Sequence, residues 1–179
     1  KRQRLSSIPW LRWPCLAYIE VVRALPLLLL IFYLFLKMPA VTVGLFSREM
    51  IAVTTALTLY TASVNAELVR AGIQGLDRGQ TEAARSLGLG YWGALRWVIL
   101  PQTYQRVLPP LLAQFTTLLK DTSLGSIIGM VELLQRGKII FQGFRNPMET
   151  LYVVAVIYFA MNFVLEQISR ATEQRRQQR

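Results

Sequence analysis

Histidine is absent from the sequence, so histidine metal ligands, His-based catalytic triads and histidine proton relays are excluded. Cysteine occurs once, as Cys15, and an internal disulfide is therefore impossible. The sequence also lacks a phosphate-binding loop of the form G-x-x-x-x-G-K-S/T. If ATP drives this protein, another subunit must bind it. A membrane enzyme is the least expected class, because no nucleophile and base converge in the sequence.

Acidic residues are few: the chain has 10 Asp and Glu against 20 Lys and Arg, a net charge of +10. A basic chain can bind nucleic acid, but that function needs a basic face interleaved with aromatic residues on a soluble body. Here the basic residues gather at both ends and around the central loop instead. This distribution is typical of residues that flank membrane spans, so we expect no nucleic-acid partner.

Long apolar runs recur along the chain, and 53% of its residues are hydrophobic. We therefore expect an all-α, polytopic membrane bundle in which the lipid bilayer is the solvent. The four expected spans cover residues 15–36, 48–70, 102–120 and 148–168. Four crossings place both basic ends, residues 1–14 and 169–179, on the cytoplasmic side. The chain opens on Lys1 rather than Met, so we expect a truncated N-terminus.

The uncharged part of the first expected span is too short, as a helix, to cross a hydrocarbon core of about 30 Å. Its helix must therefore include Glu20 and Arg23, which lie three residues apart and can pair on one face. Pro26 should kink this helix. In the second span, Glu67 and Arg70 lie near the inner interface and can pair there, while its threonines suit helix packing or a wet pore wall.

Residues 123–135 are too short to cross a bilayer, and we expect a re-entrant or outer-leaflet half-helix between the third and fourth spans. One feature opposes the resulting topology. Arg136, Lys138 and Arg145 then fall on the outer side of the membrane, against the usual bias.

The central loop, residues 71–100, is expected in the cytoplasm with a short helix over residues 80–87. A second amphipathic piece, residues 91–100, should return toward the membrane. Glycines flank the short helix. We expect Gly72, Gly75 and Gly79 to end the preceding helix. We expect Gly88 and Gly90 to form the turn after the short helix, with positive φ.

This loop carries a spaced motif: Glu82-Ala83-Ala84, then Gly88, then Leu100-Pro101. It resembles the "EAA…G…I.LP" loop of permease subunits of ABC importers, with Val98 in the isoleucine position. Glu-Ala-Ala alone is ordinary helix composition, but the whole pattern between two membrane spans is specific. The alternative is a cytoplasmic connector helix that has no partner.

Most of the chain from Tyr18 onward looks like the polar-amino-acid branch of these permeases. The matching stretches are residues 23–28 (RALPLL), 66–73 (AELVRAGI), 79–88 (GQTEAARSLG), 99–102 (ILPQ), 108–111 (LPPL) and 119–124 (LKDTSL). The resemblance implies a single permease domain over residues 15–168, and a first family helix that is missing before Lys1. One departure is Ala113, followed by Gln114, where the family commonly has Asn.

The resemblance also implies partners and a mechanism. Family members pair with a second permease subunit, bind two ABC ATPase subunits and receive substrate from an extracytoplasmic binding protein; Ala113 favours a heterodimer. No cofactor is expected in this chain, because ATP and Mg²⁺ belong to the ATPase. Import by alternating access across the bacterial inner membrane follows from the family. The residues expected to couple to the ATPase are Glu82, Ala83, Ala84, Arg85, Ser86 and Gly88.

Candidates for the substrate path are polar groups that are costly in lipid. They are Asn65, Gln114, Thr117, Lys120, Asp121 and Ser123. A zwitterionic amino acid needs a donor cluster and an acceptor, which Lys120 and Asp121 would supply. The alternative is that these two residues pair with each other or cap the half-helix.

Two other functions remain open. A permease for methionine, a phosphonate or a quaternary amine would share the loop but should lack residues 120–124 (KDTSL) and 70–73 (RAGI). A membrane anchor or assembly subunit without transport activity would need neither Gly88 nor polar residues within the membrane.

Overall fold

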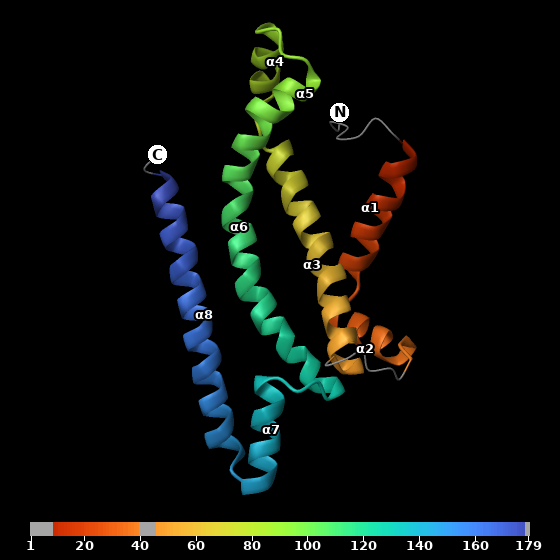
Figure 1. The fold of residues 1–179 in the computed structure, drawn as a ribbon, viewed down its shortest axis with the longest axis vertical. Coiled ribbons are helices and arrows are strands. Elements are labelled where there is room, and N and C mark those ends of the chain that lie inside the picture. Colours follow the sequence, from red (N-terminus) through yellow and green to blue (C-terminus); the bar gives the residue numbers. More distant parts are fainter. Residues whose placement is uncertain (1–8, 40–45, 178–179) are drawn as a thin grey trace. The chain divides into compact units, whose positions relative to one another are not determined.

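The computed structural model describes residues 9–39 and 46–177, and nearly all of them are helical (Figure 1). The α-helices are α1 (Pro9–Ala24), α2 (Leu27–Lys37), α3 (Arg48–Gln74), α4 (Arg78–Ser86), α5 (Tyr91–Ala94), α6 (Leu100–Asp121), α7 (Leu133–Phe144) and α8 (Pro147–Gln177). A π-helical turn, Leu95–Ile99, joins α5 to α6, and a 3₁₀ segment, Thr122–Ile128, follows α6. The all-helical class expected from the sequence is confirmed for the described residues.

The chain divides into two compact units. The first comprises Lys1–Arg23 and Ala62–Leu112, and the second comprises Ala24–Thr61 and Ala113–Arg179. Helices α3 and α6 each contribute one part to each unit. The first unit contains the central loop, and the second contains α2, α7 and α8.

The second unit has a small apolar core where α2 meets α3. Ile31, Val53, Ala56 and Leu57 are buried there, and leucines from α2 and α6 pack around them. Gly125 lies in the 3₁₀ segment against Met130 and Val53, where a Cβ would approach both side chains too closely. This segment therefore packs against the core rather than continuing α6.

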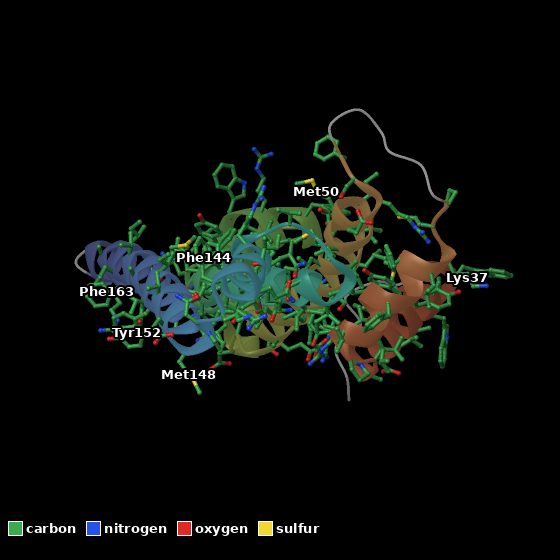
Figure 2. All side chains as sticks on the ribbon, turned by 90° about the horizontal axis from the view of Figure 1, so that it is seen from below. Lys37, Met50, Phe144, Met148, Tyr152 and Phe163 are labelled. Carbon is green, nitrogen blue, oxygen red and sulfur yellow. The ribbon has the colours of Figure 1, made fainter. Side chains whose placement is uncertain are left out.

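Helix α7 packs against α8 through a glycine. A Cβ at Gly137 would lie 2.7 Å from Cγ2 of Val154, so the close approach of the two helices requires glycine there. Away from this contact α8 is largely exposed and apolar. Figure 2 shows the side chains of Met148 and Tyr152 directed away from the helix, and they are 79% and 72% exposed.

Of the described helices, one is by itself long and apolar enough to cross a membrane, over Pro147–Ala171. Trp13–Ala24 and Leu27–Lys37 qualify together if this broken pair counts as one span. The 27 and 22 residues of α3 and α6 would reach about 40 and 33 Å. Polar residues lower their hydropathy, however, so the four-span topology stays a prediction.

Pro26 was expected to kink one continuous helix, but the first expected span is divided there into two helices. Helix α1 ends at Ala24, and Pro26 is the N-cap of α2 with φ of −58° and ψ of 130°. The prolines within the third span behave differently. Pro109 and Pro110 lie inside α6, which continues without interruption to Asp121.

The half-helix expected over residues 123–135 is not a single helix. The 3₁₀ segment ends at Gly129, which has φ of +85°, and α7 begins only at Leu133. Glycine permits this left-handed conformation, which ends the first piece. The side chain of Glu132 then accepts hydrogen bonds from the amides of Leu134 and Gln135 and starts the second.

Candidate functional site

Helix α4 lies in the central loop, between the end of α3 and α5 (Figure 1). Its N-cap is Asp77, whose carboxylate accepts a hydrogen bond of 2.9 Å from the amide of Gly79. The helix covers Arg78–Ser86, so it begins two residues earlier than the sequence predicted and ends one residue earlier.

The C-terminus of α4 closes in a Schellman motif. The amide of Leu89 donates to the carbonyl of Ala84, and the amide of Gly88 donates to the carbonyl of Arg85. Gly88 has φ of +82°, as expected, because glycine adopts the left-handed region at low cost. The expectation for Gly90 is wrong. Its φ is −65°, and it is the N-cap of α5.

The glycines before α4 also differ from the expectation. Gly72 lies inside α3 rather than ending it, and its missing side chain leaves room for Val107 of α6. Gly79 lies in the first turn of α4. Only Gly75 follows the end of α3, and the guanidinium of Arg106 donates a hydrogen bond to its carbonyl.

The residues predicted to couple to a partner divide between two faces of α4. Ala84 is only 3% exposed, in a helix that packs against α5 and the π-helical turn. The other members of the set are exposed: Glu82, Ala83, Arg85, Ser86 and Gly88. Ala84 therefore positions α4 on its own chain, whereas the exposed members are available to another molecule.

Leu87 was not among the predicted coupling residues, but its side chain is 83% exposed beside them. It follows Ala83 by four residues, so the two lie on one side of the helix end. The signal was present in the sequence, because both are apolar at one-turn spacing. Isolated exposed leucines are common, but this one extends the exposed surface of α4.

A charged cluster joins α1 to α3 in the first unit. Nε of Arg70 donates to the carboxylate of Glu67 at 2.7 Å, and a second guanidinium nitrogen donates to the other carboxylate oxygen. The predicted pair of Glu67 and Arg70 is thus confirmed. Arg23 lies 3.8 Å from Glu67, rather than forming the pair that was expected with Glu20.

The six substrate-path candidates are divided between the two units. Asn65 belongs to the first unit, where its carboxamide oxygen is buried without a hydrogen-bond partner among the described residues. The other five belong to the second unit: Gln114, Thr117, Lys120, Asp121 and Ser123.

Of these five, Ser123 already has a hydrogen-bond partner, because its hydroxyl donates to the carbonyl of Lys120 at 2.7 Å. Thr117 donates to the carbonyl of Ala113 at 3.5 Å. Lys120 is exposed and Asp121 is half-buried. Within the described residues, no group of three or more His, Cys, Asp or Glu side chains could hold a metal ion.

Sequence reasoning missed one polar network in the second unit. The hydroxyl of Tyr158 in α8 donates to Glu132 at 2.9 Å, and Glu132 also caps α7. Nearby in the chain, Nζ of Lys138 donates at 3.0 Å to the hydroxyl of Ser126, which is buried. Lys138 was noticed only as a charge against the expected topology, and no local pattern predicts the partner of Glu132 or of Lys138.

Comparison with known proteins covers nearly the whole chain. Residues 5–178 match the family described as the binding-protein-dependent transport system inner membrane component. The chain is 36% identical over 175 residues to the probable glutamine ABC transporter permease protein GlnP of Bacillus subtilis, covering 96% of this chain and 79% of that one. It is 36% identical over 171 residues to the glutamate transport system permease protein GluD of Corynebacterium glutamicum, covering 95% and 63%.

A solved structure shares the fold. The crystal structure of an amino acid ABC transporter with histidines matches with a TM-score of 0.87 and 34% identity, covering 96% of this chain and 79% of the other. The chain therefore belongs to the binding-protein-dependent transport system inner membrane component family, the permease subunits of ABC transporters.

Proposed function

We propose that this chain is a membrane-spanning subunit of an ATP-driven importer that moves amino acids across the bacterial inner membrane. The observation that carries the proposal is α4, a helix capped at both ends that exposes Glu82, Ala83 and Arg85. Its sequence has the spacing of the coupling loop of ABC importers. Relatives named for glutamine and glutamate transport favour amino acids as the substrate class.

The proposed mechanism is alternating access. ATP binding to a separate ATPase stabilises one of two conformations of the complex, and α4 transmits that preference to the membrane helices. Leu87 and Ala83 supply an apolar contact for a groove on the ATPase, and Glu82 supplies a charge that can pair with a basic residue there. Packing against α5 and the π-helical turn holds α4 to its own chain when the ATPase displaces it.

The full complex would contain two ATPase subunits, a second permease subunit and an extracytoplasmic amino-acid-binding protein. We favour a heterodimer, because Ala113 stands where the family commonly has asparagine. Co-purification of two differently tagged copies of this chain tests this point. Recovery of both tags in one complex would establish a homodimer instead.

The chain is expected to cross the membrane four times. Helices α1 and α2 together form the first crossing, and α3, α6 and α8 form one crossing each. The apolar surface of α8 supports contact with lipid or with the second permease subunit, because its apolar side chains are largely exposed in this chain.

The substrate path is proposed to include Asn65, Gln114, Thr117, Lys120, Asp121 and Ser123. Lys120 is the sharpest candidate, because an exposed ammonium group can pair with a substrate carboxylate. Lys120→Met should raise the KM for uptake and leave the number of assembled complexes nearly unchanged. An unchanged KM would favour the alternative, in which Lys120 pairs with Asp121 or caps the half-helix.

Uptake of a panel of labelled amino acids by cells with and without the full complex tests the main proposal. Glu82→Lys should abolish ATP-driven uptake without loss of membrane insertion, because it reverses a charge at the ATPase contact. The matched control is Glu166→Lys, another exposed carboxylate, whose partner is Arg170 on the same helix.

Each result of this panel has a defined meaning. Uptake of one amino-acid class that is lost in Glu82→Lys and kept in Glu166→Lys supports both the substrate class and the coupling loop. Uptake of methionine, a phosphonate or a quaternary amine alone points to the other-solute permease. Normal uptake by Glu82→Lys excludes α4 as the coupling element.

A further inference from the structure

The connection between α3 and α4 is short and is held by side chains from the beginning of α6. Only residues 75–77 separate the end of α3 at Gln74 from the start of α4 at Arg78. A connection of this length could pivot, and a pivot would absorb any movement of α4. Two side chains of α6 hold it: Arg106 contacts Gly75 at its start, and Gln102 contacts Gln80 in α4 just after its end.

The first contact reaches α4 directly. Nε2 of Gln102 donates a hydrogen bond of 3.0 Å to Oε1 of Gln80, a residue 22 positions earlier in the chain. Gln80 lies in the first turns of α4, beside the N-cap Asp77. Gln102 thereby ties the N-terminal part of α4 to α6.

The second contact reaches the end of α3. The guanidinium of Arg106 donates to the carbonyl of Gly75, one of the carbonyl groups that a helix C-terminus leaves without an intrahelical partner. Gln102 and Arg106 are four residues apart, so they lie on one face of α6. The same turns of α6 carry Thr103 and Val107, which are buried, and Val107 fits into the space left by Gly72 of α3.

We propose that Gln102 and Arg106 are positioning residues that lock the connection between α3 and α4, so that displacement of α4 moves α3 and α6 together. This inference rests on the proposed function, in which α4 is moved by the ATPase. One bond holds Gly75, the first residue of the connection, and the other holds Gln80, which lies just beyond it in α4, so the connection cannot pivot freely. The apolar contact of Val107 with Gly72 keeps the two longer helices in register.

The experiment uses the complete complex in proteoliposomes and measures the number of amino-acid molecules transported per ATP hydrolysed. Gln102→Ala and Arg106→Ala should each lower this ratio about fivefold, which corresponds to ~1 kcal/mol of coupling free energy. Arg106→Lys should restore much of it, because an ammonium group can still donate to a carbonyl. Gln105→Ala is the matched control, since Gln105 is an exposed glutamine on the same helix, and it should keep the wild-type ratio.

A second measurement reports on the lock itself. Spin labels are attached at Arg85→Cys in α4 and at Gln105→Cys in α6, in a Cys15→Ser background. The distance between the two labels should have a narrow distribution, and adding Arg106→Ala should broaden it. Wild-type ratios in both alanine variants, or an unchanged distance distribution, would overturn the inference while leaving the transport function intact. Loss of complex assembly in both alanine variants would also overturn it, because the bonds would then be structural only. Absence of amino-acid transport by the wild-type complex would instead refute the proposed function.

Discussion

At the scale of single residues, the two glycines that follow α4 separate two reasons for requiring glycine, a positive φ and a lack of room for a side chain. A Cβ at Gly88 or at Gly90 would meet no atom within 4 Å. The two positions differ in backbone conformation, with φ of +82° at Gly88 and −65° at Gly90. A side chain therefore strains the backbone at the first position and not at the second.

This difference makes a paired prediction. Gly88→Val should destabilise the end of α4 by ~1–2 kcal/mol, because an L-residue is held in the left-handed region. Amide hydrogen exchange should then be faster in α4, and ATP-driven uptake should fall. Gly90→Ala should change neither quantity. Equal effects of the two variants would mean that the Schellman motif does not stabilise the helix end.

The N-cap of α4 gives a second prediction at this scale. Asp77→Ala removes the acceptor for the amide of Gly79 and should cost about 1 kcal/mol of helix stability, whereas Asp77→Asn should keep most of it. Hydrogen exchange at the amides of the first turn measures the effect. Protection that is unchanged in Asp77→Ala would show that the cap is dispensable.

At the scale of helices, each unit has one close helix contact that depends on a glycine inside a helix. A Cβ at Gly72 would lie 2.2 Å from Cγ2 of Val107, and a Cβ at Gly137 would lie 2.7 Å from Cγ2 of Val154. Small residues allow helix backbones to approach closely, which is the usual basis of helix association in membranes.

Gly72→Ala should therefore destabilise the protein by about 1–3 kcal/mol through overpacking against α6. The thermal midpoint of the detergent-purified complex measures this loss. Adding Val107→Ala should recover part of it, because the clashing methyl groups are removed. The control is Gly143→Ala in α7, where a new Cβ would meet no atom within 4 Å. An equal loss in the control would exclude overpacking as the cause.

At the scale of the whole molecule, the main open prediction is the four-span topology. In a Cys15→Ser background, a cysteine at Arg85 should react with an impermeant thiol reagent only from the cytoplasmic side. A cysteine at Gly143, in the last turn of α7, should react only from the outer side. Labelling of both from one side would require a different number of crossings between the central loop and α8.

The sequence by itself determined the features that depend on neighbouring residues. It predicted an all-helical chain, a short helix in the central loop, a distortion of the helix at Pro26, the turn at Gly88 and the pair of Glu67 with Arg70. Each depends on local rules, such as helical periodicity, the fixed φ of proline and the freedom of glycine. The family followed from the same local spacing.

Only the tertiary structure decided which helix faces meet. It gave Arg23 the partner Glu67 instead of Glu20, placed Ala84 against α5 and the π-helical turn, and used Gly72 for packing rather than as a break. It also joined Glu132 to Tyr158, 26 residues away. Helical periodicity shows which residues share a face, but the partner of that face depends on contacts between segments distant in sequence, which no local pattern records.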